Sequence, residues 1–244
     1  MQIQVERSER LASIGRLAAG IAHEIRNPLA SISGSVEMLR GLPGAEGEAR
    51  QLVDIAVREV DRLNGLITEL LAYARPRAEE KQTFDLAEIA SEIAKAFEQE
   101  RREHDVQVKV KAEPGVGVEG APGQIRQVLW NLLRNAAEAM PRGGVIQLQV
   151  TREDTSGRPP WTLLSVRDTG VGIAPEDIRH IFEPFFSRKP GGTGLGLATV
   201  ARIVEDHRGH IEIDSPPGGG TEFALRFPYV HVPAQPPGAH GTLG

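Results

Sequence analysis

Apolar residues recur at helical spacing through the first third of the chain. One stripe falls in residues 5–40 and consists of Leu11, Ile14, Ala18, Ile21, Ile25, Ile32 and Leu39. A second falls in residues 48–73 and consists of Leu52, Ala56, Leu63, Leu66, Ile67 and Leu70. This spacing is typical of amphipathic helices. Residues 41–47, which are rich in glycine and include a proline, predict a short loop that makes the two helices an antiparallel hairpin.

A single hairpin cannot cover both sides of its own apolar stripe. Pairing two hairpins into a four-helix bundle would cover it, so we expect a homodimer. The alternative is a monomeric hairpin packed against a second domain of the same chain. Residues 1–74 form this first predicted domain, and the polar, proline-containing residues 75–82 form a linker.

After the linker the pattern changes to mixed helices and strands. Helices are expected at residues 85–103, 123–140 and 194–206, and strands at residues 106–110, 145–151, 163–167, 210–214 and 222–227. This mixture predicts an α/β domain over residues 83–228. The proline-rich residues 229–244 predict a disordered tail.

Composition narrows the possible classes of protein. With 244 residues the chain can hold one large domain or two modest ones, and its net charge of −5 argues against a nucleic-acid surface. The absence of cysteine excludes disulfides and thiolate metal sites. No apolar run approaches the roughly 20 residues that span a bilayer, and the first residues lead us to expect no signal peptide. We therefore expect these residues to make no membrane contact and to be cytoplasmic, although a longer parent chain could be membrane-anchored.

His23 lies beside Glu24 on the first predicted helix, away from its apolar stripe. An exposed imidazole next to a carboxylate can act as a nucleophile or proton carrier. An ordinary surface histidine is the alternative reading. Pro28 removes a backbone donor and predicts a kink just after His23.

Two blocks of the second domain carry side chains suited to a nucleotide. Asn131 and Asn135 are one helical turn apart, and amide oxygens suit Mg²⁺. Asp168 directly follows a predicted strand, where a carboxylate can accept a hydrogen bond from an exocyclic amine such as that of adenine. Gly170 and Gly172 would let the backbone approach a flat ring. Ordinary surface asparagines and an ordinary turn are the alternatives.

Two further blocks suit phosphate groups. Residues 182–189 hold three phenylalanines followed by Arg188 and Lys189, which could reach phosphates from a mobile flap. Residues 191–196 read Gly-Gly-Thr-Gly-Leu-Gly before a helix, a pattern that predicts a phosphate cradle. No lysine follows the last glycine as in a Walker loop, and no strand directly precedes the block as in a dinucleotide fold.

The order of these blocks, with His23 upstream, closely resembles that of sensor histidine kinases over residues 8–228. The matching boxes are residues 23–28 (H), 131–140 (N), 168–172 (G1), 182–186 (F) and 192–196 (G2). The sequence around His23 is most similar to the nitrogen-regulation subclass. The resemblance implies an α plus α/β fold, with a helical-hairpin dimerisation domain, a four-helix bundle in the dimer, followed by a Bergerat-type α/β sandwich that binds ATP.

The resemblance also implies roles for individual residues. His23 would be the phosphoacceptor, Glu24 would accept its proton or fix its tautomer, and Asn27 would position water for a phosphatase reaction. Asn135 would hold Mg²⁺. The expected nucleotide-binding residues are Asn131, Arg134, Asn135, Asp168, Gly170, Gly172, Lys189, Gly192, Thr193, Gly194, Leu195, Gly196 and Thr221.

The function implied is ATP-dependent autophosphorylation of His23 and phosphotransfer to an aspartate of a response-regulator receiver domain, together with phosphatase activity toward that regulator. An upstream sensor domain or sensor protein would supply the signal. Three alternatives stay open: a gyrase-like ATPase, an ATP-binding scaffold, and a regulator that acts mainly as a phosphatase. The first is disfavoured because Asn131 stands where gyrase-like enzymes have a glutamate base.

Overall fold

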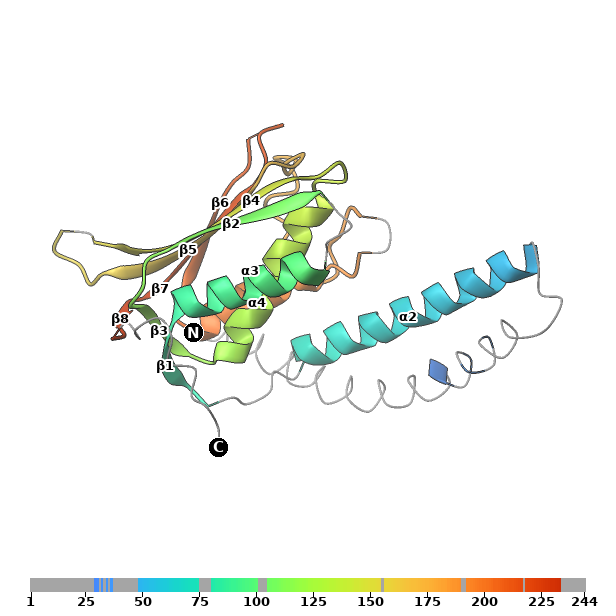
Figure 1. Cartoon of the computed structure of the whole chain (residues 1–244), viewed down its shortest axis with the longest axis horizontal. Helices are drawn as coiled ribbons and strands as arrows, with labels where there is room; N and C mark the ends of the chain where they lie inside the picture. Colours follow the sequence, from blue (N-terminus) through green and yellow to red (C-terminus); the bar gives the residue numbers. More distant parts are fainter. Residues whose placement is uncertain are drawn as a thin grey trace. The chain divides into compact units, whose positions relative to one another are not determined.

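The computed structural model describes residues 29–30, 32, 34, 36, 48–74, 80–100, 105–154, 156–189, 192–216 and 218–233 (Figure 1). The chain divides into two units. Met1–Ala78 with Pro184–Gly196 forms the first, and Glu79–Glu183 with Leu197–Gly244 forms the second.

The first unit contains the long helix α2 (Glu48–Ala74), at the place predicted for the second helix of the hairpin. Its Val60 and Ile67 are buried in one cluster with Leu29. Leu52, however, is 66% exposed and Ile55 is 53% exposed. Much of the apolar surface of α2 is therefore accessible in the single chain. Among the described helices, none combines the length and apolar character that a membrane-crossing segment needs.

The second unit is built on a five-stranded sheet. Its strands follow the order β2 (Val106–Ala112), β4 (Gly144–Glu153), β5 (Trp161–Asp168), β7 (Glu222–Pro228) and β6 (His210–Asp214). Strands β2 and β4 run parallel, whereas every other neighbouring pair is antiparallel. Strand β5 therefore lies at the centre of the sheet.

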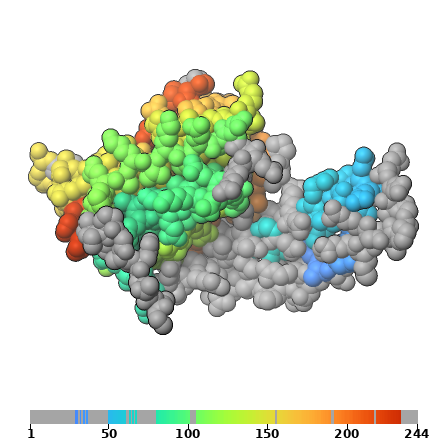
Figure 2. All heavy atoms as spheres, in the orientation of Figure 1, coloured from blue at the N-terminus to red at the C-terminus, as the bar shows by residue number. Residues whose placement is uncertain are grey.

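Helices α3 (Leu86–Glu100) and α4 (Pro122–Glu138) pack against one face of this sheet (Figure 1). The strand residues that alternate toward that face, such as Ile146, Leu148 and Leu164, are fully buried. Helix α3 is amphipathic, and its outer side forms a broad part of the surface of this unit (Figure 2). The predicted α/β sandwich is confirmed.

The described helices and strands of this unit fall close to the predicted ranges. The helices expected at 123–140 and 194–206 are Pro122–Glu138 and Gly196–Asp206 (α5). Strand β6 has the predicted bounds.

A second, three-stranded sheet was not predicted. It has the order β1 (Gln82–Asp85), β3 (Val116–Gly120) and β8 (Val230–His231), and both pairs are antiparallel. Asp85 joins it to α3, because its carboxylate accepts hydrogen bonds from Ala87 N at 2.8 Å and from Gly115 N at 2.7 Å. The first of these bonds caps the helix.

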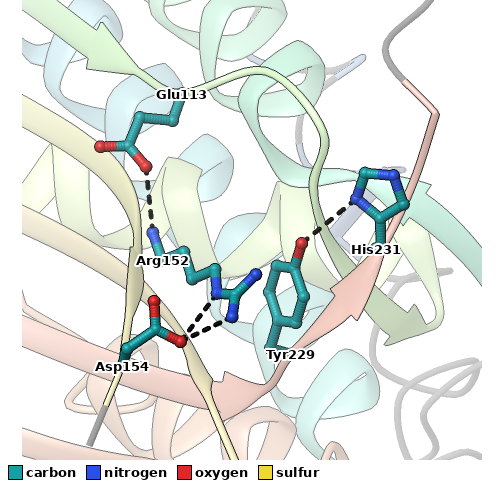
Figure 3. Close-up of polar contacts among 5 residues, drawn as sticks. All are labelled: Glu113, Arg152, Asp154, Tyr229 and His231. Carbon is teal, nitrogen blue, oxygen red and sulfur yellow. Dashed lines mark hydrogen bonds and ion pairs between the residues drawn. The ribbon is translucent and has the colours of Figure 1, made fainter.

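The prediction that a disordered tail starts at residue 229 is wrong at its boundary. Tyr229 N donates to Pro160 O at 3.3 Å, and β8 pairs with β3, so these residues are held on the domain. Arg152 lies 4.7 Å from the ring centre of Tyr229, and the Tyr229 hydroxyl contacts His231 Nδ1 at 3.2 Å (Figure 3). A cation over an aromatic face is attractive, and this contact helps to hold the segment on the domain.

Arg152 is itself fixed by a carboxylate. Its guanidinium donates two hydrogen bonds, of 2.9 and 2.7 Å, to Asp154 Oδ1, and this pairing raises the pKa of Arg152 (Figure 3). Residues 234–244 of the predicted tail lie outside the described part of the chain.

Candidate functional site

A buried carboxylate lies at the end of β5, the central strand of the five-stranded sheet. Asp168 is 4% exposed, and its Oδ1 accepts hydrogen bonds from Gly170 N at 2.7 Å and Thr221 N at 3.3 Å. Its own backbone N donates to Thr221 O at 2.9 Å. Backbone donors from two separate loops therefore fix the orientation of this acid.

Close backbone packing explains the glycines of the loop after Asp168. A Cβ atom on Gly170 would lie 2.7 Å from Ala139 O and 2.8 Å from Asp168 Oδ1. Gly172 has φ +78°, in the left-handed region that favours glycine. A side chain at Gly170 would displace the loop, and one at Gly172 would strain its backbone.

The same loop contacts the end of helix α4. Val171 N donates to Ala139 O at 3.3 Å, and Ala139 N in turn closes the helix on Asn135 O at 3.1 Å. The structure thus brings together the end of the helix that bears Asn131 and Asn135 and the loop that begins at Asp168. Both asparagines are half-buried.

Arg134, predicted to bind the nucleotide, lies between these two asparagines in the sequence. Its Nε is 3.6 Å from Glu138 Oε1, one turn further along α4. Among the residues that the structure describes, no cluster of three or more His, Cys, Asp or Glu side chains is arranged to hold a metal. A cation at this end of α4 would depend on amide oxygens and on oxygen atoms of its ligand.

A residue that sequence analysis missed completes the region. Ser215 follows β6 and is buried; it accepts a hydrogen bond from Ile173 N at 2.8 Å and donates one to Gly220 O at 3.1 Å. Its hydroxyl also lies 3.0 Å from Thr221 Oγ1. In the sequence Ser215 precedes two prolines and three glycines, which read simply as a loop.

The predicted phosphate cradle belongs to the first unit. Phe185 N donates to Gly194 O at 3.1 Å, and Gly192 N donates to Lys189 O at 3.1 Å. Thr193 Oγ1 accepts from Leu195 N at 3.2 Å just before helix α5.

Two residues of this segment have positive φ. Phe185 has φ +69° and is 67% exposed, and Gly194 has φ +68°. A Cβ on Gly194 would lie 2.6 Å from Phe186 N. The glycine is therefore required for the turn to close on the phenylalanines. Helix α5 starts two residues after Gly194, at Gly196.

The predicted acceptor site, with His23, Glu24 and Asn27, lies outside the described residues. The predictions for these three side chains stay predictions.

Each of the two parts of the chain matches a known protein family. Residues 120–231 match the family described as "Histidine kinase-, DNA gyrase B-, and HSP90-like ATPase". Residues 13–79 match the family described as "His Kinase A (phospho-acceptor) domain". The first range contains Asp168 and its surroundings, and the second contains His23.

Individual relatives agree with these matches. The sensor histidine kinase ZraS of Klebsiella oxytoca is 41% identical over 93% of this chain, but the chain spans only 49% of that protein. Full-length ShkA, solved with AMPPNP, is similar with a TM-score of 0.73 and 25% identity, over 90% of this chain and 47% of ShkA.

The histidine kinase ThkA is similar in two solved forms. Its catalytic domain is 33% identical with a TM-score of 0.53, over 61% of this chain and 97% of that domain. Its complex with the response regulator protein TrrA gives 30% identity and a TM-score of 0.66, over 94% of this chain and 66% of ThkA.

The turn before β7 offers a matched pair of glycine substitutions. Gly218 and Gly220 both have positive φ, but only at Gly220 would a Cβ collide with the backbone of Asp168. We expect Gly220→Ala to weaken binding of an ATP analogue at least tenfold, because it displaces Asp168. Gly218→Ala introduces only backbone strain of about 1 kcal/mol and should keep wild-type affinity. Isothermal titration of both variants checks this, and equal affinities would contradict it.

Proposed function

We propose that this chain, which belongs to the sensor histidine kinase family of two-component systems, uses ATP to phosphorylate its own His23 and passes the phosphoryl group to an aspartate of a response-regulator receiver domain. The proposal is carried by one observation. The buried, hydrogen-bonded Asp168 lies within the residues that match the ATPase family, and the same chain matches the phosphoacceptor family around His23. The chain spans about half the length of ZraS, so the activity of the whole protein is part of the proposal.

The Asp168 region supports adenine as the base. A carboxylate only accepts hydrogen bonds, so it pairs with the exocyclic amine of adenine and opposes a carbonyl in the same place. Gly170 and Gly172 put no side chain between the loop and a base bound beside it. The residues 192–196 would hold the phosphates, as their resemblance to the G2 box implies.

The end of α4 supports Mg²⁺ as the accompanying ion. Asn135 and Asn131 supply neutral amide oxygens, which suit an ion that keeps several waters and takes its remaining ligands from phosphate. Bound there, Mg²⁺ would neutralise charge on the phosphates. The half-burial of both asparagines is compatible with this task.

The proposed transfer forms a bond from nitrogen to phosphorus. The lone pair of the neutral imidazole of His23 attacks the γ-phosphorus, the bond to the bridging oxygen breaks, and ADP leaves with the bond electrons. The proton on the other ring nitrogen is accepted by, or held toward, Glu24. An exposed histidine, with a reference pKa of about 6.5, is mostly neutral at pH 7.

The partners follow from the same proposal. The ThkA structure contains a response regulator protein, and we propose a partner of that class here. A sensor domain or a separate sensor protein would supply the signal. Because ATP and receiver domains are cytoplasmic, we place this part of the protein in the cytoplasm; its recovery in an extracytoplasmic fraction would contradict that placement.

The kinase proposal is tested by incubation with Mg²⁺ and γ-labelled ATP. We expect acid-labile, base-stable label on the wild type and none on His23→Ala. Asn135→Ala should label at least about 100-fold more slowly, because charge on the phosphates is no longer balanced. His231→Ala, which removes an exposed histidine of β8, should label normally. Label that persists in His23→Ala would refute the assignment of the acceptor.

A phosphatase activity is proposed for Asn27. If its amide positions water beside the phosphoaspartate of the regulator, Asn27→Ala should slow regulator dephosphorylation about 10- to 100-fold through lost positioning. Autophosphorylation of the variant should be retained. Release of phosphate from a purified phosphorylated receiver measures the effect, and an unchanged rate rules the role out.

The exposed apolar surface of α2 supports a homodimer. Leu52 is 66% exposed, so burial of the remaining surface in both protomers would contribute about 2–4 kcal/mol. Leu52→Asp should therefore weaken the dimer at least about thirtyfold. Arg58→Ala, an exposed polar change on the same helix, should not. Sedimentation velocity distinguishes the two. A wild type that is monomeric at all concentrations would instead favour the hairpin packed on its own chain.

A further inference from the structure

Ser215 occupies a position where three polar groups converge on one hydroxyl. It is 8% exposed, and its Oγ lies 2.8 Å from Ile173 N, 3.1 Å from Gly220 O and 3.0 Å from Thr221 Oγ1. Ile173 belongs to the loop after Asp168, whereas Gly220 and Thr221 belong to the turn before β7. One buried side chain therefore ties together the two backbone segments that hold Asp168.

The chemistry of these partners fixes the direction of each hydrogen bond. A hydroxyl has one hydrogen and two lone pairs. Ile173 N can only donate, and Gly220 O can only accept. All three contacts are satisfied only if Ser215 gives its hydrogen to Gly220 O and accepts from both Ile173 N and the Thr221 hydroxyl.

This arrangement determines what Thr221 can offer to a ligand. With its hydrogen directed to Ser215, Thr221 Oγ1 presents lone pairs alone to any further partner, directly or through one water. The same residue is locked to Asp168 by two backbone hydrogen bonds, one in each direction. Neither the Asp168 carboxylate nor the Thr221 hydroxyl then has a hydrogen to give to a ligand.

We propose that Ser215 is a specificity-determining positioning residue, which touches no ligand but favours adenine over guanine by holding the Thr221 hydroxyl as an acceptor. The inference rests on the proposed binding of ATP. Adenine offers an amine where guanine has a carbonyl, and a carbonyl that faces two acceptors would be left unpaired. Without Ser215, the Thr221 hydroxyl is free to turn and donate to that carbonyl.

The test compares the affinities of the full chain for Mg²⁺·ADP and Mg²⁺·GDP by isothermal titration calorimetry. We expect the wild type to prefer ADP. Ser215→Ala should bind ADP about tenfold more weakly without a matching loss of GDP affinity, so the ADP-to-GDP preference shrinks about tenfold. An equal loss for both nucleotides, or no loss, would overturn the proposal, because it would mean that Ser215 only holds the two loops or does nothing for binding.

Two further sets of variants keep the test independent of folding. Thr221→Ser retains the hydroxyl and should keep the wild-type preference, whereas Thr221→Val should lose it. Thr162→Val removes a fully buried hydroxyl that donates to Gly117 O at 2.8 Å at the other end of β5, and should change neither affinity. A Thr221→Val variant with the wild-type preference would overturn the proposal even if Ser215→Ala failed to fold.

A wild type that binds neither nucleotide would refute the proposed function itself. A wild type that prefers ADP, with the same preference in Ser215→Ala and Thr221→Val, would refute only the role of Ser215. Both tryptophans, Trp130 and Trp161, lie in the second unit, so their fluorescence reports whether each variant keeps that unit folded.

Discussion

The reciprocal pairing of Asp168 with Thr221 is the interaction on which the candidate site depends. A buried carboxylate is unfavourable unless hydrogen bonds replace its lost water, and here backbone donors from two loops do so. The backbone N of Asp168 also donates to Thr221 O, at the point where β5 ends and β7 begins. The acid is consequently oriented by main-chain atoms. These hold it more rigidly than a flexible side-chain partner would.

Glycine makes this arrangement sterically possible. Gly170 lies against Ala139 O, and Gly220 lies against the carbonyl of Asp168, each at a distance that leaves no room for a Cβ. The helix end, the loop after β5 and the turn before β7 can therefore meet around one carboxylate. These glycines serve close packing, and the loops they form are hydrogen-bonded rather than loose.

The sequence predicted those parts of the fold whose signals are local. Helix α4 and strand β6 have clear periods and were located closely. Strand β3 was missed because its five residues include Gly117 and Gly120, which resemble a turn. The structure explains Gly117, since a Cβ there would lie 2.7 Å from Val230 O in the neighbouring strand β8. Strand β8 was missed as well, because it lies among the prolines of the tail and its pairing partner is distant in sequence.

The residues of the candidate site likewise divide into those that the sequence predicted and those that it did not. Asp168, Gly170 and Gly172 could be predicted because they form one contiguous block. Ser215 could not, since its contact with Ile173 spans 42 residues and exists only after β6 and β7 have paired. The acceptor side chains around His23 rest on sequence and family resemblance alone.

The identity of residue 131 bears on which nucleophile the site can serve. Enzymes of the gyrase type resemble this domain but place a glutamate base four residues before the metal-binding asparagine, where this chain has Asn131. An amide cannot take a proton from water at neutral pH, so it cannot generate hydroxide beside the γ-phosphate. A neutral imidazole needs no such activation, because its attacking nitrogen already bears a free lone pair. In the proposed reaction, an amide at position 131 would therefore limit hydrolysis of ATP by water and still allow transfer of the phosphoryl group to His23.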